Sequence, residues 1–352
     1  MTDLAPIGPT VVATPYSIKN LPPLIIGGAV FNTQYTSNPQ SLPIAQVLHK
    51  AFELGLNAID TSPYYGPSEE LLGNALKSLL FTRDQYYICT KAGRIKLNEF
   101  DYSRANVRAS VARSLQRLGT SYLDLVYMHD IEFVEAPQIY EALKELKKLK
   151  QEGLIKNFGV SGYPVDYLYE IALGSYQDPE IGALDAILSY SNGCIQNVSL
   201  FDYYDKFHKE CGIGKLMNGS ILSMSLLRSG STLSFHPAAQ TLKDKVAEVA
   251  QYLESQHQVE LADLATRFAL KKWLFDSAVQ PEDSEEHEWN AVTSTVLGVS
   301  SIRELDVAIS SYWQVKRNIG GINEKDELLF QKVKELLGDH FNEVWPSGID
   351  RS

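Results

Sequence analysis

The strongest constraint on the fold is a series of short apolar runs, each of the length and composition of a β-strand. Eight of them recur along the chain, at residues 24–26, 57–60, 86–90, 123–128, 156–160, 184–190, 220–225 and 295–299. Longer stretches with a helical pattern separate most of them. Strands that alternate with helices of about 10–15 residues are typical of βαβ units, in which the strands run parallel.

The clearest of the intervening helical patterns covers residues 104–118, where Val107, Val111, Leu115 and Leu118 fall on one face. Comparable patterns cover 43–56, 68–79 and 137–152. Eight strands in succession, without a break in composition, favour a closed (β/α)8 TIM barrel over an open sheet. We predict one domain over residues 1–352, with the barrel core at about 24–310 and a helix and tail at 323–352.

Two segments depart from the strand–helix rhythm. Residues 227–239 are rich in Ser and Gly and contain the sequence Phe235-His-Pro-Ala238, which predicts a loop. Residues 276–290 are acidic and polar, which predicts an exposed insertion before the last strand.

Charge and composition limit the class of partner and the compartment. The formal net charge is −11, which argues against nucleic acid or an anionic membrane as the main partner. We see no secretory signal and no apolar run long enough to span a membrane. The three cysteines lack metal-type spacing, which favours reduced, buried thiols. We therefore expect a cytosolic protein, a monomer or a weak homo-oligomer.

Four polar residues lie at or just after the ends of successive strand-like runs: Asp60, Tyr65, Lys91 and His129. Strand ends meet on one face of a parallel barrel, and that face carries the active sites of TIM-barrel enzymes. A phenol needs help to ionise at neutral pH, and a nearby ammonium lowers its pKa. Lowering the pKa of the phenol by three units requires about 4 kcal/mol of differential interaction between its two protonation states. The pattern predicts Tyr65 as acid/base, Lys91 and Asp60 as its tuning pair, and His129 at the substrate oxygen.

Each of these four residues, taken alone, is more often structural, so the prediction depends on their common face. Other catalytic motifs are absent: there is no Gly-x-Gly-x-x-Gly after a strand, no His-Glu-x-x-His and no Gly-x-Ser-x-Gly. The nearest approach to a phosphate loop is Gly212-Ile-Gly214, which lacks the third glycine. The seven histidines are scattered, so no metal site is predicted.

The segments Asp60-Thr-Ser-Pro-Tyr-Tyr65-Gly66 and Ser68-Glu-Glu-Leu-Leu-Gly73 resemble the signature of the aldo-keto reductases. Cys89-Thr-Lys91, Leu125-Val-Tyr-Met-His129-Asp130 and Phe158-Gly-Val-Ser161 match at the family's spacing. The resemblance implies a barrel that binds a nicotinamide cofactor in extended form at its C-terminal face. It also implies for Asp60, Tyr65, Lys91 and His129 the roles given above.

The family resemblance also bears on the choice of cofactor. The positions at which the family usually carries a Lys and an Arg for the 2′-phosphate of NADP correspond here to Gly298 and Glu304. An acid repels a phosphate and suits a free ribose hydroxyl, so we expect NAD. Arg303 leaves NADP open, because a shift of one residue would restore a basic group.

The remaining cofactor contacts depart partly from the family. The family usually has a Ser-Asn pair that binds the carboxamide of the nicotinamide. This pair corresponds here to Ser161-Gly162, so only Ser161 carries over. On the sixth strand, Ser189 is the candidate for a contact with the carboxamide. In the seventh-strand loop, Ser225 and Leu227 match positions that usually meet the pyrophosphate.

Within the family, Leu188-Ser-Tyr190 and Phe235-His-Pro-Ala238 resemble the sugar dehydrogenases that oxidise an aldose at C1 to its lactone. We expect such an enzyme here, with D-arabinose as the aldose. His236 is a candidate for substrate binding, although we prefer the alternative, a loop residue that shapes the substrate mouth. The rival functions are an NADP-dependent aldehyde or ketone reductase, a barrel that binds cofactor without turnover, and a Schiff-base aldolase that uses Lys91.

Overall fold

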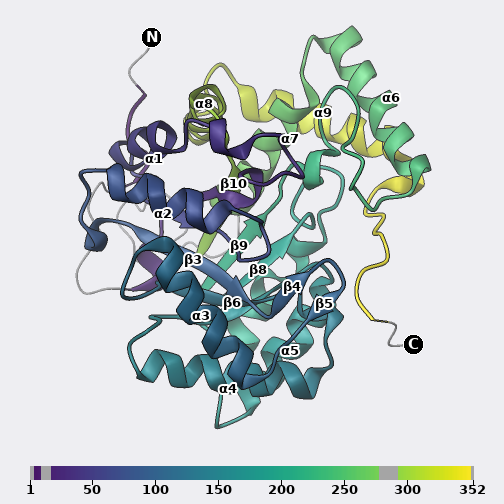
Figure 1. The fold of residues 1–352 in the computed structure, drawn as a ribbon. Helices are drawn as coiled ribbons and strands as arrows, with labels where there is room; N and C mark the ends of the chain where they lie inside the picture. The colour runs from purple at the N-terminus through teal and green to yellow at the C-terminus, as the bar shows by residue number, and fades with distance from the viewer. Residues whose placement is uncertain (1–3, 9–16, 277–291, 350–352) are drawn as a thin grey trace.

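The computed structural model describes residues 4–8, 17–276 and 292–349, and within them eight parallel strands close into a barrel. Figure 1 shows the barrel in the centre with helices around it. The strands, in the order β1-β10-β9-β8-β7-β6-β3-β2 around the barrel, are Leu24–Gly27, Thr293–Gly298, Lys215–Gly219, Ala186–Tyr190, Phe158–Gly162, Leu125–His129, Tyr87–Ala92 and Ala58–Asp60. The predicted (β/α)8 barrel is confirmed.

Helices follow most strands, as the sequence pattern predicts. They are α1 (Ile44–Glu53), α2 (Ser68–Ser78), α3 (Arg104–Leu118), α4 (Ala136–Gln151), α5 (Val165–Gln177), α6 (Gln240–His257), α7 (Leu261–Leu270), α8 (Ile302–Lys316) and α9 (Ile322–Leu337). The bounds of α3 follow from its ends. Ser103 accepts a hydrogen bond from the backbone nitrogen of Asn106, and Gly119 takes the left-handed conformation that ends the helix.

One strand prediction is wrong. The seventh strand is β9 at Lys215–Gly219, and residues 220–225 form the loop that follows it. The cause is that Lys215 and Asn218, both fully buried, break the apolar run that marks a strand in the sequence. A short hairpin of β4 (Arg94–Lys96) and β5 (Glu99–Phe100), which the sequence did not indicate, follows β3.

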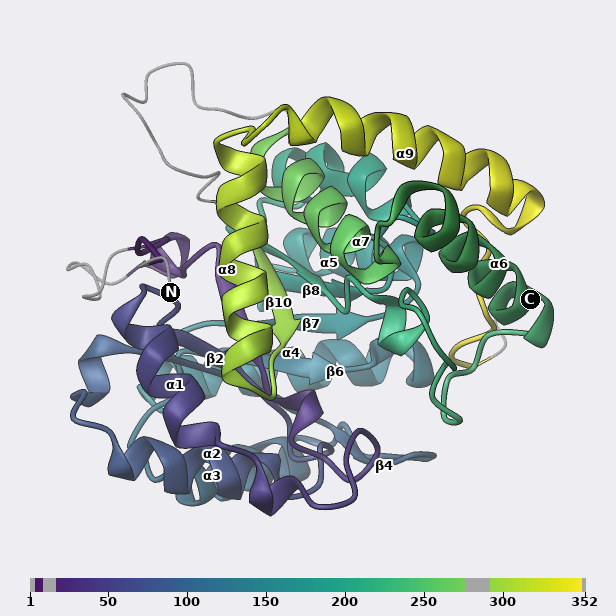
Figure 2. The same cartoon turned by 90° about the horizontal axis from the view of Figure 1, so that it is seen from above.

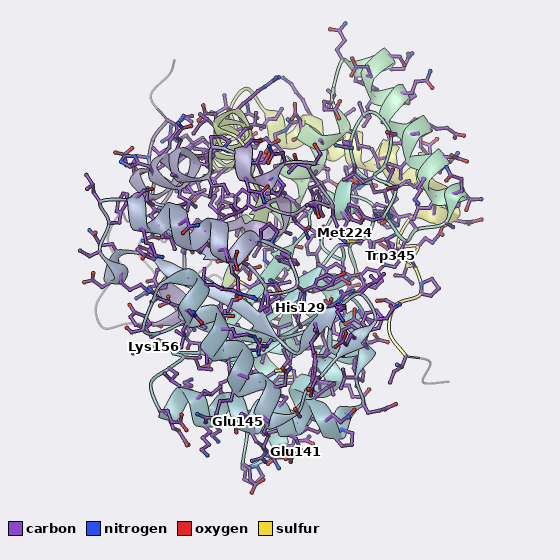
Figure 3. All side chains as sticks on the ribbon, in the orientation of Figure 1. His129, Glu141, Glu145, Lys156, Met224 and Trp345 are labelled. Carbon is purple, nitrogen blue, oxygen red and sulfur yellow. The ribbon has the colours of Figure 1, made fainter. Side chains whose placement is uncertain are left out.

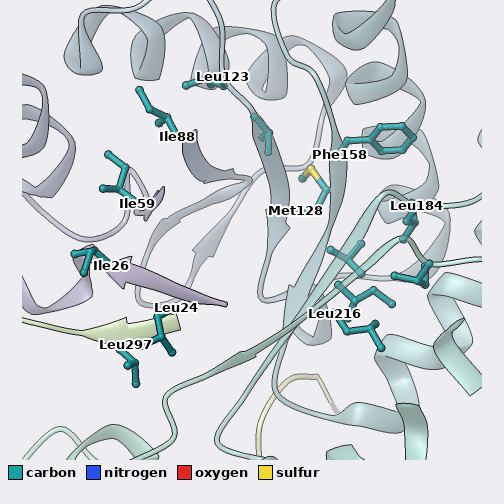
Figure 4. Packing of buried hydrophobic residues seen from close by; sticks show 14 of the residues in the cluster. Leu24, Ile26, Ile59, Ile88, Leu123, Met128, Phe158, Leu184, Leu216 and Leu297 are labelled. Carbon is teal, nitrogen blue, oxygen red and sulfur yellow. The ribbon is translucent and has the colours of Figure 1, made fainter. Parts of the chain in front are cut away.

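Alternation along the strands separates two hydrophobic layers. One row faces the helices and includes Leu24, Ile26, Ile59, Ile88, Met128 and Leu216, as Figure 4 shows. The other row faces the barrel axis and includes Ile25, Ala58, Cys89, Tyr127, Leu188, Met217 and Val296. Side chains at even offsets along a strand share a face. The inward-facing residue nearest the C-terminal end of each strand therefore lies at the C-terminal mouth of the barrel.

The chain after the barrel covers one side of the molecule. α9 lies across α6 and α7, and the segment after it descends along the side of the barrel (Figures 1 and 2). Part of the acidic segment 276–290 that we expect to be exposed lies outside the described residues. Within them, no helix is both long and apolar enough to cross a membrane.

Candidate active site

Three of the four predicted catalytic residues end the inward rows of neighbouring strands. Asp60 on β2 pairs in register with Cys89, two residues before Lys91 on β3. Lys91 pairs with Tyr127, two residues before His129 on β6. These even offsets put all three side chains on the inner face, each one step further along the barrel axis. The structure therefore brings together the residues that the sequence singled out.

Tyr65 lies in the loop between β2 and α2, and hydrogen bonds fix the ends of this loop. The backbone nitrogen of Thr61 donates to the carbonyl of Cys89 at 2.9 Å. Ser68, the first residue of α2, shares a hydrogen bond of 2.8 Å with the Thr61 hydroxyl and donates to the Gly28 carbonyl at 2.9 Å. The phenol is therefore carried by a braced turn.

Lys91 lies between Asp60 and Tyr65. Its Nζ donates to Oδ1 of Asp60 at 2.5 Å and to the carbonyl of Thr61 at 2.9 Å, and it lies 4.9 Å from the centre of the Tyr65 ring. Only 2% of the Lys91 side chain is exposed. Asp60 and Tyr65 raise the pKa of Lys91 although burial lowers it, so the ammonium persists at neutral pH. A permanently charged amine is a poor Schiff-base nucleophile, which argues against the aldolase alternative.

The pKa of Tyr65 differs from the expectation. Burial raises it above 10, Lys91 lowers it by its charge and a hydrogen bond, and Asp60 and Asp130 raise it. The desolvation of the phenol is the largest contribution, and proximity to an ammonium alone does not include it. Tyr65 is therefore a neutral phenol at neutral pH.

His129 faces Tyr65 across the mouth, with ring centres 5.6 Å apart and perpendicular planes. Figure 3 labels His129 near the middle of the molecule. Burial, Lys91 and Arg94 lower its pKa well below 6.5, so the imidazole is neutral. Its Nδ1 lies 2.9 Å from the hydroxyl of Ser62, which accepts from the backbone nitrogen of Tyr64. Ser62 still has its hydroxyl hydrogen to donate to Nδ1, and we assign the tautomer that this bond requires, with the ring proton on Nε2.

The site contains polar residues that the sequence analysis did not single out. Asp130 follows His129 in the left-handed conformation, with φ 56°, and forms an ion pair with Arg94 of β4. Glu132, in the same loop, is fully buried. The sequence could have indicated Asp130, because it is the acid directly after the predicted catalytic histidine. Nothing in the sequence indicates that Arg94 turns back toward it.

The predicted pyrophosphate loop follows β9 and has an unusual backbone. Ser220, Ser223, Met224 and Ser225 all have positive φ. The Ser225 hydroxyl accepts from the backbone nitrogen of Leu233 at 3.1 Å, and Leu227 is buried. The hydroxyl of Ser223 is buried and has no hydrogen-bond partner among the described residues. A buried hydroxyl without a partner in a loop of this shape fits an anionic ligand with oxygen acceptors.

The predicted contacts at the adenosine end lie at the end of β10 and the start of α8. Gly298 is exposed. The carboxylate of Glu304 accepts from the backbone nitrogen of Ser300 at 2.7 Å and from its hydroxyl at 2.9 Å. Ser301 caps the helix by accepting from the Glu304 nitrogen at 3.2 Å. These hydrogen bonds hold the Glu304 side chain in place at the N-terminus of this helix.

The two carboxamide candidates face opposite ways. Ser161 ends the inward row of β7, and its hydroxyl donates to the carbonyl of Met128 at 3.3 Å. Ser189 lies next to the inward-facing Leu188, so it points outward, and its hydroxyl accepts from Asn192 at 3.2 Å. Its orientation does not favour a carboxamide contact.

His236 braces the cofactor loop. Its Nε2 bonds to the carbonyl of Ser223 at 2.9 Å, and its Nδ1 accepts from the backbone nitrogen of Ala238 at 3.1 Å. Burial lowers its pKa to about 4. The Trp345 ring lies edge-on, 5.0 Å away, and stacks on Tyr163. Figure 3 labels Trp345 and Met224 close together above His129. Both ring nitrogens of His236 are engaged, and its contact with a sugar stays a prediction.

Comparison with known proteins agrees with this geometry. Residues 23–323 match the model of the Aldo/keto reductase family. The chain is 47% identical over 339 residues to D-arabinose 1-dehydrogenase of Saccharomyces cerevisiae, covering 95% of this chain and 96% of that protein. It is 32% identical over 313 residues to L-galactose dehydrogenase of Arabidopsis thaliana, covering 87% of each.

Two solved structures share the fold at lower identity. Glycerol dehydrogenase of Gluconobacter oxydans has a TM-score of 0.60 at 18% identity, covering 100% of this chain and 99% of that one. An aldo-keto reductase of Bacillus halodurans, in its holo form, has a TM-score of 0.60 at 20% identity, covering 89% and 92%. These likenesses concern the barrel alone.

Proposed function

Because the chain belongs to the aldo/keto reductase family, whose enzymes use a nicotinamide cofactor, we propose that it is a NAD-dependent aldose 1-dehydrogenase. The reaction would oxidise D-arabinose at C1 to the aldono-1,4-lactone. The observation that carries the proposal is the buried contact of Lys91 with Asp60 and Tyr65, opposite a neutral His129. The similarity to D-arabinose 1-dehydrogenase supports the choice of sugar.

The mechanism follows from the charges of the site. The cyclic sugar binds with its anomeric hydroxyl between Tyr65 and His129, where Nε2–H of the neutral imidazole donates to the sugar oxygen. The phenolate form of Tyr65 removes the hydroxyl proton and becomes the neutral phenol, and the fixed Lys91 ammonium stabilises the phenolate that must form before this step. Asp60 keeps Lys91 charged and in place. Burial raises the pKa of Tyr65, so the oxidation rate is expected to increase as the pH rises and the phenol ionises.

The residues above β9 and β10 would hold the cofactor. Ser161 would bind the carboxamide, the loop with Ser225 and Leu227 would bind the pyrophosphate, and Gly298 and Glu304 would lie at the adenosine ribose. When bound, the nicotinamide ring accepts the hydride from C1. The acid Glu304 supports NAD, because its carboxylate is held by Ser300 at a position where the family resemblance expects a basic residue for the 2′-phosphate.

The cofactor proposal can be tested by initial rates with NAD and with NADP. We expect NAD to be preferred, and Glu304→Arg to raise the NADP-to-NAD ratio of kcat/KM by about tenfold, the equivalent of about 1.4 kcal/mol. Glu304→Gln, which removes the charge without adding one, serves as the control and should move the ratio less. Strict use of NADP by the unsubstituted chain would contradict the proposal.

The catalytic proposal can be tested with Tyr65→Phe. The change removes only the phenol oxygen, so we expect turnover of D-arabinose to fall by at least about 10²- to 10⁴-fold, the range for general acid–base groups. Binding of NAD, followed by quenching of tryptophan fluorescence, should stay nearly unchanged. Near-normal turnover in this variant would show that Tyr65 is not the acid/base.

A further inference from the structure

Two residues outside the catalytic four form a charged pair at the mouth. Asp130 comes directly after His129, and Arg94 comes from the β4–β5 hairpin that follows β3. Both are shielded from solvent, with exposed side-chain fractions of 5% and 11%. Asp130 adopts φ 56° and ψ 63°, a conformation that L side chains other than Asn and Asp rarely take. The left-handed turn brings the carboxylate back beside the histidine that it follows.

The Asp130 carboxylate and the His129 imidazole are close neighbours that do not form a good hydrogen bond with each other. Oδ2 of Asp130 lies 3.5 Å from Nε2 of His129, the nitrogen assigned to the substrate oxygen. This is too long for a good hydrogen bond between the two side chains. A group bound at Nε2 therefore has the Asp130 carboxylate as its immediate neighbour.

Arg94 is held in place, and one of its N–H donors has no hydrogen-bond partner among the described residues. Its guanidinium pairs with Asp130 and lies over the Tyr64 ring, 3.9 Å from the ring centre. One terminal nitrogen donates to the carbonyl of Leu97 at 3.2 Å. The Nε atom is buried, and the described part of the chain offers it no hydrogen-bond partner. A fixed guanidinium beside a carboxylate can donate to one oxygen of a diol while the carboxylate accepts from the other.

We propose that Asp130 and Arg94 form the subsite for the hydroxyl on C2 of the aldose, the carbon next to the one oxidised. This inference rests on the proposed function. The C1 oxygen of the sugar has two neighbouring oxygens, the C2 hydroxyl and the ring oxygen. The ring oxygen cannot donate a hydrogen bond, and a carboxylate can only accept one. Asp130 therefore turns the C2 hydroxyl toward itself, which fixes the orientation of the ring.

The test compares D-arabinose with 2-deoxy-D-arabinose, which lacks only the C2 hydroxyl. In the unsubstituted chain with NAD, kcat/KM should favour D-arabinose. Asp130→Asn should reduce that preference by about 10- to 100-fold, the range for a hydrogen bond to a charged group. Because each variant is compared with itself on two sugars, any general loss of activity cancels in the ratio.

Two further variants sharpen the test. Asp326→Asn breaks another buried pair, with Arg267, between α7 and α9, and should leave the sugar preference unchanged. Arg94→Lys keeps the charge but loses the planar fork, and should reduce the preference; it decides the question if Asp130→Asn does not fold.

The outcomes separate this inference from the function on which it rests. If Asp130→Asn and Arg94→Lys lose activity equally on both sugars, the pair only positions His129 or the hairpin, and the subsite is refuted. Absence of any preference for the 2-hydroxyl in the unsubstituted chain refutes it as well. If the unsubstituted chain oxidises neither sugar with NAD or NADP, the proposed function fails, and the subsite with it.

Discussion

Replacing Glu132 with Gln should change how the stability of this protein depends on pH. Glu132 is fully buried beneath the C-terminal segment. One carboxyl oxygen accepts from the backbone nitrogen of Tyr163 at 3.1 Å, from the hydroxyl of Ser347 at 3.1 Å and from that of Tyr190 at 3.5 Å. Its other oxygen has no hydrogen-bond partner within the described ranges. Burial, with the charge of Asp130, raises the pKa of Glu132 to about 8.

The sign and the size of the effect follow from this pKa. Between its ordinary value of 4.5 and about 8, the folded protein keeps the Glu132 proton while the unfolded chain loses it. The free energy of unfolding therefore falls as the pH rises through this window, by about 1.4 kcal/mol per pH unit. The whole loss is on the order of 4–5 kcal/mol and is complete above the folded pKa. The neutral amide of Glu132→Gln has no proton to lose.

The assay is urea denaturation at several pH values. Between pH 5.5 and pH 8, Glu132→Gln should gain about 3 kcal/mol relative to the unsubstituted protein, and the difference should level off at higher pH. Glu135→Gln, at an exposed position three residues on, should show no such trend. If the difference between Glu132→Gln and the unsubstituted protein is constant with pH, Glu132 is ionised in the folded state and the reasoning is refuted.

Two further substitutions test the packing of the barrel. Lys91→Met leaves the buried Asp60 without its cation and should lower the free energy of unfolding, measured by urea denaturation, by about 3–5 kcal/mol. Lys96→Met, in an exposed pair, should change it little. Equal effects of the two substitutions would contradict the buried ion pair. In Gly159→Ala the new Cβ would lie 1.9 Å from the Ala186 carbonyl of the next strand, so we expect a lower melting temperature and a loss of about 1–3 kcal/mol or more. Gly214→Ala, with its nearest atom at 3.4 Å, is the control.

The fold could be predicted wherever side-chain pattern and burial agree. Residues 104–118 show apolar spacing, a capping serine and a terminal glycine, and α3 has those bounds. The prediction failed at β9, because the strand carries Lys215 into the interior, where its Nζ donates to the carbonyl of Leu21 at 3.1 Å. A buried lysine looks like a surface residue in the sequence, and only the fold provides the carbonyl that accommodates it.

The site could be predicted where the strands position it, and only partly where loops do. Asp60, Lys91 and His129 end strands, so their common face follows from the barrel. The meeting of Asp130 with Arg94 depends on a left-handed residue and a hairpin, neither of which has a signal in the sequence. Desolvation also depends on the fold, which is why the pKa of Tyr65 is raised where proximity to an ammonium alone predicts that it is lowered.

The inward rows of the strands support the proposal that one barrel mouth holds both the catalytic groups and an extended cofactor. On the adjacent strands β2, β3, β6 and β7, the row ends in Asp60, Lys91, His129 and Ser161. On β1, β10 and β9, which are also adjacent, the row ends in Gly27, Gly298 and Gly219. Four adjacent strands of the rim thus end in polar side chains, and three adjacent strands, which we call the bare half, end in glycine.

The bare half of the rim lies beneath the loops that hold the predicted cofactor residues. Ser225 and Leu227 follow β9, and Glu304 follows β10. A long ligand can lie over the strands that end in glycine and extend one end toward the strands that end in Lys91 and His129. Tyr190, which ends the inward row of β8, marks the boundary between the two halves. The alternation of the β-strands therefore places the predicted catalytic side chains on one part of the rim, and it supports the proposal that the cofactor extends over the strands that end in glycine.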